Sequence, residues 1–201
     1  MSNIFKKLEK EATAAGIQMR TRQARDWFRT RAREMHDINR KDLSKEKRLV
    51  QLDKKANPIG SMIMFFYDPK TKEQLPYYDK FPLTIVVGPA PGGFHGLNLH
   101  YLAPALRASL LDNLMEITTN KRFDETTRFK ATYSLLTSAN KYRYFKPCFK
   151  HYLSNHVQSN YAMVNASDWE IATFLPTASW SKASSNTVWR DSRKIINGQY
   201  R

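Results

Sequence analysis

The sequence predicts an α+β protein in which a small antiparallel β-domain with surrounding helices lies between a basic helical N-terminal arm and an extended C-terminal tail. Three observations support this. Residues 1–56 contain none of the nine prolines and one of the seven glycines. Short apolar runs bounded by turn residues follow, and helical periodicity then returns. The apolar content of 41% suffices for one hydrophobic core.

The segment 1–56 is predicted to form a basic helical arm with helices over 4–15, 18–38 and 44–55. Ser2 or Asn3 can cap the first helix and Gly16 can end it. The apolar stripes of these helices are thin, so they need a partner surface to be stable. We therefore expect the arm to be completed by another molecule.

The segment 57–176 is predicted to be the globular α+β domain, and it begins at the turn Asn57-Pro58-Ile59-Gly60. Strands are expected over 62–67, 82–87 and 93–101. Three short strands in about forty residues favour a small, strongly bent antiparallel sheet, with an SH3-like barrel as its candidate form. Helices are expected from Pro104 onward and over 125–137, 147–153 and 167–174.

The segment 177–201 is predicted to be a basic, tryptophan-containing tail without regular structure. It has five basic residues against one acid, two tryptophans, and many Ser, Thr and Asn residues. Such a composition favours an extended segment that is ordered by its neighbours.

The charge balance indicates what kind of partner to expect. The 33 Lys and Arg residues exceed the 18 Asp and Glu residues, which gives a formal net charge of +15. A charge of this size favours nucleic acid or another acidic surface as a partner. The single cysteine, Cys148, excludes an intrachain disulfide framework and a metal site made of cysteines alone.

The hydropathy pattern of the sequence predicts neither a membrane-spanning helix nor a signal peptide. No apolar stretch approaches the roughly 18 residues that a membrane-spanning helix needs, and the N-terminus lacks an apolar signal core. We expect a soluble intracellular protein, or a component of a particle assembled inside a cell, with no membrane partner.

Six arginines between positions 20 and 33 give the strongest functional signal. On a helix, Arg22, Arg25, Arg29 and Arg33 lie at i, i+3, i+7 and i+11, which is one face. Guanidinium groups bind phosphate through paired N–H donors, so this row matches a nucleic-acid backbone. The alternative is a solvated face partly neutralised by nearby acids. The aromatic residues set among the arginines favour binding, to nucleic acid or to an acidic protein surface.

The tail alternates aromatic and basic residues in two short stretches. The residues concerned are Trp180, Lys182, Trp189, Arg190, Arg193 and Lys194. Such a pattern stacks on nucleobases or anchors a tail on a neighbouring subunit. Packing of the tryptophans onto their own domain is an equally good interpretation.

Signals for catalysis or metal binding are weak. Cys148 and His151 share a face of the predicted helix 147–153, but no fourth metal ligand is evident. Asp53 and Asp68 lie near lysines, as in metal-dependent nucleases, yet neither has a second carboxylate at the usual spacing. We therefore predict no catalytic residue, no metal ligand and no cofactor. A metal-dependent nuclease acting on DNA ends stays as an alternative.

Two stretches resemble proteins of one group. The first, from Tyr67 to Leu102, reads Tyr-Asp-Pro-Lys…Leu-Pro-Tyr-Tyr-Asp-Lys-Phe-Pro-Leu…Gly-Phe-His-Gly-Leu-Asn-Leu-His-Tyr-Leu. The second reads Asp168-Trp169-Glu170…Leu175-Pro176…Lys182-Ala183…Val188-Trp189…Ser192-Arg193-Lys194. Together they cover about a third of the chain and are similar to virion or assembly proteins of T-even-like contractile-tailed bacteriophages, with the DNA end protector as the candidate type. The resemblance implies a phage particle as context and no set of catalytic residues.

These observations together predict a non-enzymatic structural protein of a tailed-phage particle, a late protein. Its basic arm and tail are expected to contact double-stranded DNA, other virion proteins or both, near the head–tail passage (head completion) or the genome end. It is expected in the virion and, during assembly, in the host cytoplasm. A tail or baseplate component without DNA contact is the structural alternative.

Overall fold

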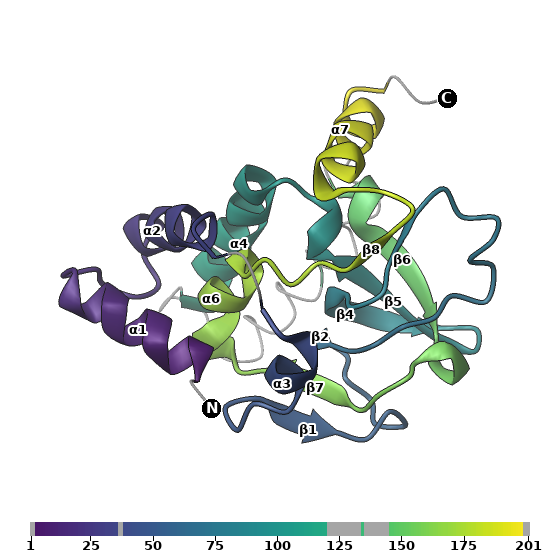
Figure 1. Ribbon diagram of the computed structural model, residues 1–201, viewed down its shortest axis with the longest axis horizontal. Helices are drawn as coiled ribbons and strands as arrows, with labels where there is room; N and C mark the ends of the chain where they lie inside the picture. Colours follow the sequence, from purple (N-terminus) through teal and green to yellow (C-terminus); the bar gives the residue numbers. More distant parts are fainter. Residues whose placement is uncertain (1–2, 36–37, 120–133, 135–144, 199–201) are drawn as a thin grey trace.

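The computed structural model describes residues 3–35, 38–119, 134 and 145–198, and it combines helices with an antiparallel sheet (Figure 1). The helices α1 (Ile4–Ala14), α2 (Arg22–Ala32), α4 (Pro104–Thr119) and α6 (Trp169–Phe174) gather on one side of the molecule. The sheet lies on the other side, and α7 (Ser185–Ile196) stands at one end. The α+β class predicted from the sequence is confirmed.

The main sheet has six strands in the order β1-β7-β2-β4-β5-β6, and every neighbouring pair is antiparallel. The strands are β1 (Val50–Leu52), β2 (Met62–Met64), β4 (Leu83–Ala90), β5 (Gly93–Asn98), β6 (Phe149–Leu153) and β7 (Tyr161–Val164). A second, two-stranded sheet joins β3 (Tyr78–Asp79) to β8 (Trp180–Ser181). The SH3-like form of the main sheet stays a prediction.

Strand β2 is apolar throughout because both of its faces are buried. Successive side chains of a strand point to opposite faces. Met62 and Met64 accordingly lie in the main core, which the sheet shares with the helices, whereas Ile63 lies in a second apolar cluster. The predicted strand over 62–67 is thus confirmed at its start.

The second cluster is largely aromatic and lies on the other face of the sheet. Phe65 makes edge-on contacts with the rings of Tyr67, Phe94, Tyr152 and Tyr161, at centroid distances of 5.2–6.0 Å. Edge-on aromatic pairs add about 0.5–1.5 kcal/mol each beyond the burial of their area. This cluster holds β2, β5, β6 and β7 together.

The N-terminal segment packs against the rest of the chain and does not stand apart as an arm. Phe5, Leu8 and Phe28 are at most 4% exposed and belong to the main core. Arg48 donates to Glu9 of α1 at 2.6 Å and to Asp168, before α6, at 2.8 Å. The thin apolar stripes of these helices do have a partner surface, and it lies within the same chain.

The C-terminal segment differs from the predicted extended tail. Its start forms β8, where Trp180 pairs with Asp79 of β3. Ser184 then caps α7 by accepting from the N–H of Thr187. Val188 and Ile196, which lie about two helical turns apart, are buried, so one face of α7 packs against the protein. The many Ser, Thr and Asn residues suggested irregular structure, but one of them serves as a helix cap.

Two predicted helices are wrong. The range 44–55 contains the end of α3 (Arg40–Ser44), a turn and β1, and 147–153 is mostly β6. Strand β6 forms because β5 offers a paired edge, and Gly93 permits the close approach: a Cβ there would lie 1.8 Å from the carbonyl oxygen of Tyr152. The helix predicted over 125–137 falls almost wholly outside the described residues.

Several other elements agree with their predictions. Asn3 caps α1 by accepting from the N–H of Lys6 at 2.8 Å, and Gly16 follows the helix with a φ of +70°. Helix α4 begins at Pro104 as expected, and α6 falls within the predicted range 167–174. Helix α2 is shorter than the predicted range 18–38. The remaining described elements are single 3-10 turns: η1 (Leu99–Tyr101), η2 (Lys146–Cys148), η3 (Ser154–His156) and η4 (Ala166–Asp168).

Candidate nucleic-acid interface

Three of the four arginines predicted to form the binding row on α2 face outward. Arg22, Arg29 and Arg33 follow one another at spacings of seven and four residues, which places them on one side of the helix. Arg29 pairs with Asp26 at 2.9 Å, while Arg22 and Arg33 form no side-chain hydrogen bond or ion pair with another described residue. Their guanidinium groups are therefore available to a phosphate backbone.

Arg25 takes a different role from the one predicted, because it points into the protein. It is 8% exposed and lies 3.1 Å from the carboxylate of Glu170, which is 1% exposed, and it also pairs with Asp112. A buried carboxylate needs a counter-charge. Arg25 thus joins α2 to α6 and α4, and it does not belong to the exposed row.

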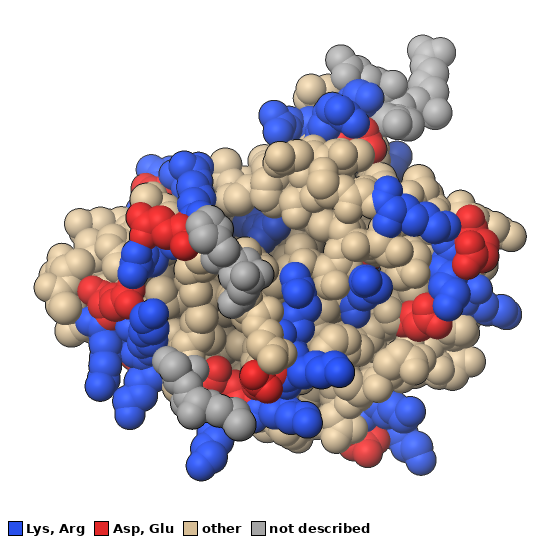
Figure 2. All heavy atoms as spheres, in the orientation of Figure 1, with Lys and Arg blue, Asp and Glu red and all other residues tan. Residues whose placement is uncertain are grey.

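Helix α7 presents the basic residues of the tail on its outward side. Arg190, Arg193 and Lys194 are exposed and lie opposite the buried Val188 and Ser192. The three form the α7 basic face. Asp191 lies 3.9 Å from Arg190 and 3.8 Å from Lys194, so one carboxylate lies near two of the three cations. Figure 2 shows basic and acidic side chains interspersed over α1 and α2, and mostly basic ones on α7 at the top of the view.

The other predicted tail residues fasten the tail to its own domain. Trp180 packs edge-on against Tyr101 with a centroid distance of 4.9 Å. Trp189 donates its indole N–H to the carbonyl oxygen of His100 at 2.9 Å. Lys182, which has a φ of +67°, donates to the carbonyl oxygen of Lys72 at 2.7 Å. Both tryptophans therefore pack onto their own domain, which is one of the two interpretations that the sequence allowed.

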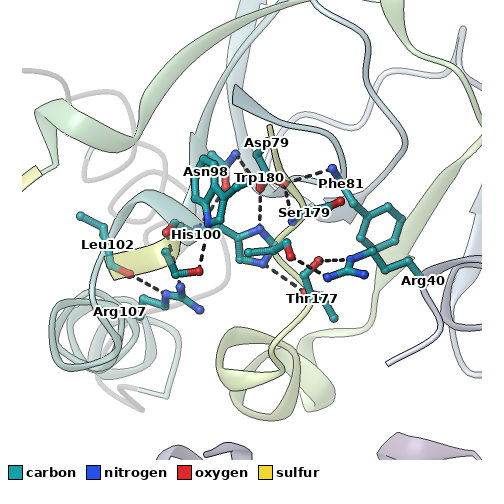
Figure 3. Close-up of polar contacts among 12 residues, drawn as sticks. Arg40, Asp79, Phe81, Asn98, His100, Leu102, Arg107, Thr177, Ser179 and Trp180 are labelled. Carbon is teal, nitrogen blue, oxygen red and sulfur yellow. Dashed lines mark hydrogen bonds and ion pairs between the residues drawn. The ribbon is translucent and has the colours of Figure 1, made fainter. Parts of the chain in front are cut away.

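A buried polar network, unrecognised in the sequence, holds this C-terminal segment in place (Figure 3). His100 lies between Asp79 and Thr177, with Nδ1 2.6 Å from the Asp79 carboxylate and Nε2 3.1 Å from the Thr177 hydroxyl oxygen. Arg40 donates to the carbonyl oxygens of Thr177 and Ala178 at 2.8 and 2.7 Å. These contacts join Arg40 of the N-terminal segment, His100 of the middle segment and Thr177 of the C-terminal segment in one network.

A second arginine completes the network from α4. Arg107 is 5% exposed and donates to the carbonyl oxygens of Leu102, Thr173 and His100, at 2.8, 3.1 and 3.4 Å. Burial lowers the pKa of Arg107 to about 10. A guanidinium with five donors can satisfy several carbonyl groups at once, so Arg107 joins η1 to α6 without forming an ion pair with any described carboxylate.

The order Thr177, His100, Asp79 resembles that of a nucleophile, a general base and an orienting carboxylate. Thr177 and His100 have no exposed surface, however, and Asp79 is only 4% exposed. Burial lowers the pKa of His100, and Arg107 and Arg40 act in the same direction against the opposing effect of Asp79. A carboxylate only accepts hydrogen bonds, so neutral His100 donates from Nδ1 to Asp79. We assign the network a structural role.

The residues considered for metal-dependent cleavage are separate in the structure. Asp68 pairs with Lys72 at 3.0 Å, and Asp53 accepts from the backbone N–H of Lys55. Cys148 is buried, which raises the pKa of its thiol to about 12. Among the residues that the structure describes, no group of three His, Cys, Asp or Glu side chains is placed to hold a metal ion. Within those same residues, no helix is long and apolar enough to cross a membrane.

Comparison with known proteins gives one match. Residues 1–192 match the model of a family described as the phage T4 terminal DNA protecting protein. No curated protein and no solved structure matches the chain. The family match confirms the resemblance to T-even-like phage proteins of the DNA end protector type, and it extends it from two stretches to nearly the whole sequence.

Proposed function

The chain belongs to the family of the phage T4 terminal DNA protecting protein, and from this we propose that it binds the ends of linear double-stranded DNA and shields them, without catalysing a reaction. The family description names both the ligand, DNA, and the part of it concerned, the terminus. The fold, the surface charge and the buried network then indicate how such a protein works.

The observation that carries the proposal is the pair of outward basic surfaces. One is the α2 basic face, which we define as Arg22, Arg29 and Arg33; the other is the α7 basic face. Phosphate contacts supply sequence-independent affinity, because each cation releases counterions from the DNA. A protein that covers any DNA end needs this kind of affinity, since it must accept whatever sequence the end carries.

The buried and half-buried arginines support the same interpretation by contrast. Arg25, Arg40, Arg48 and Arg107 hold the fold together through carboxylates and carbonyl oxygens. The net charge of +15 therefore overstates the cations that can reach a ligand. The arginines of the α2 and α7 basic faces stay outside this internal network, and a polyanionic ligand explains their position.

The proposal includes a place in the phage particle. We propose that the protein accompanies the genome end in the virion, next to other virion proteins, and is present in the host cytoplasm while particles assemble. The alternative of a tail or baseplate component without DNA contact is less well supported, because the family description refers to DNA and its termini.

An exonuclease assay tests the proposal. A linear duplex is incubated with the purified protein and then exposed to an exonuclease that digests from open ends, and the remaining full-length DNA is measured. We expect the protein to preserve the linear duplex at concentrations that cover its ends. Digestion at the rate seen without protein would contradict the proposal. Cleavage of the DNA by the protein itself in Mg²⁺ or Mn²⁺ would favour the nuclease alternative.

A further inference from the structure

A cavity of about 490 Å³ lies between α7, β6 and the loop that leads to β3. Tyrosine rings form much of its lining: Tyr67, Tyr77, Tyr78, Tyr101 and Tyr152. Its volume is within the range of small-molecule sites, and aromatic faces are the surfaces on which unstacked nucleobases lie. The cavity is therefore of a size and chemistry that suit one nucleotide.

A cation without an anionic partner faces this cavity. The ammonium group of Lys150 lies 3.9 Å from the centroid of the Tyr101 ring, and no acidic side chain among the described residues forms an ion pair with it. Burial lowers the pKa of Lys150 to about 8. Apart from the face of the Tyr101 ring, no described acidic group offsets the desolvation of this cation, and a bound anion supplies that counter-charge.

A second unsatisfied group lies at the same place. Ser192 of α7 is 2% exposed, lines the cavity, and its hydroxyl oxygen has no hydrogen-bond partner among the described residues. Buried polar groups are nearly always hydrogen-bonded, so a bare one calls for an explanation. A ligand in the cavity accounts for both Ser192 and Lys150.

The charges around the cavity favour a doubly charged phosphate. Two cations, Lys70 and Lys150, line it together with the imidazole of His151, against one carboxylate, Asp79, which already accepts from His100. A phosphate monoester at the end of a strand carries more negative charge than the diester within it. We propose that the cavity receives a phosphorylated terminal nucleotide of DNA, with its base on the tyrosine rings and its phosphate at Lys150.

This inference rests on the proposed function and explains how a sequence-independent DNA-binding protein distinguishes ends. An internal nucleotide is paired and stacked, and leaving the stack has an energetic cost that is smallest for a base that is already unpaired. A terminal nucleotide frays most easily, so it enters the cavity where an internal one does not. The basic faces then bind the adjoining duplex.

The test compares the affinity of the full chain for a linear duplex with its affinity for a covalently closed circle of the same sequence. Linear duplexes with a 5′-phosphate, a 3′-phosphate or hydroxyl groups only distinguish the two strand ends as sources of the phosphate. We expect the wild-type protein to prefer one of the phosphorylated linear duplexes over the circle. Lys150→Gln should reduce this preference about tenfold, since the contact of a cation with a phosphate is worth at least that much. Ser192→Leu, which fills the cavity and excludes the base, should reduce it by a similar factor.

The matched control is Lys146→Gln, which removes the same charge from an exposed lysine in η2, four residues away. It should leave the preference for ends unchanged, and unchanged binding of the circle by Lys150→Gln shows that the variant is folded. An end preference that survives both Lys150→Gln and Ser192→Leu overturns the inference about the cavity. Absence of any end preference or end protection in the wild-type protein is a different outcome, because it overturns the proposed function itself.

Discussion

The guanidinium of Arg25 in α2 and the carboxylate of Glu170 in α6 lie 3.1 Å apart, although the two residues are 145 positions apart in the sequence. Glu170 also accepts the backbone N–H of Arg20 at 2.7 Å. Burial raises the pKa of Glu170, and its interactions with Arg20 and Arg25 oppose that rise. The pair fixes α2 on α6, and so it determines which of the α2 arginines reach solvent.

Replacing Arg25 should therefore destabilise the protein and leave the α2 basic face chemically intact. Arg25→Met leaves the Glu170 carboxylate buried without its main counter-charge, and we expect a loss of about 3–5 kcal/mol in the free energy of unfolding. The matched variant Arg22→Met, on the exposed side, should change it by less than about 0.5 kcal/mol. Urea denaturation measures both, and equal stabilities of the two variants would contradict the assignment.

The buried histidine predicts a dependence of stability on pH. Burial lowers the pKa of His100 below its ordinary value of 6.5, so below that pH the unfolded chain binds a proton that the folded chain does not. The contribution of His100 is then lost as the pH falls below 6.5, by up to about 1.4 kcal/mol per pH unit. Above this pH, His100 adds no pH dependence.

The comparison of His100→Gln with the wild-type protein isolates this effect. The difference between their free energies of unfolding should shrink as the pH falls from 7 to 5. His156→Gln, at a half-buried histidine outside this network, serves as the matched control. The lowered pKa of His95 acts in the same direction and the raised pKa of Glu170 in the opposite one, and both cancel in the comparison. A difference that is constant over this range would show that His100 is not buried in its neutral form.

The terminal segments should be necessary for folding. Phe5 and Phe28 from the N-terminal segment and Val188 from α7 lie in the same core as the sheet. A fragment of residues 57–176 lacks all three, and we expect it to be unfolded by circular dichroism. In the isolated full chain, the amides of α1, α2 and α7 should be protected from hydrogen exchange. A folded fragment, or unprotected terminal helices, would restore the sequence-based view of a separate arm and tail.

The salt dependence of DNA binding should divide between the two basic faces. Replacing Arg22, Arg29 and Arg33 with Ala removes up to three phosphate contacts, so the slope of log affinity against log salt should flatten by roughly 2–3 units. Replacing Arg190, Arg193 and Lys194 should have an effect of similar size. Fluorescence anisotropy with a fixed duplex gives the slopes. If the substitutions on one of the two helices leave the slope unchanged, that helix lies outside the DNA interface.

The sequence predicted those elements whose signals are local. Asn3 and Gly16 delimit α1, and the continuous apolar run that begins at Met62 marks a strand buried on both faces. Strand β6 was missed because it depends on pairing with β5 and on the absence of a side chain at Gly93. Local composition cannot show such a pairing.

The candidate site was predictable only in part for the same reason. Helical spacing places Arg22, Arg29 and Arg33 in one row, but the inward turn of Arg25 depends on Glu170, which is distant in sequence. The network around His100 joins residues separated by up to 138 positions. The cavity beside Lys150 exists because α7 packs on η1 and η2 beside β6, which the irregular composition of the tail gave no reason to expect.

Footprinting on a linear duplex labelled at one strand tests the central claim most directly. The purified protein is titrated onto the duplex, and a nuclease that cuts internally reports which base pairs are covered. The account predicts that protection appears first at the terminal base pairs of both ends, while the interior and a closed circle of the same sequence stay accessible at that concentration. Protection that develops evenly along the duplex, with no lead at the ends, would contradict it.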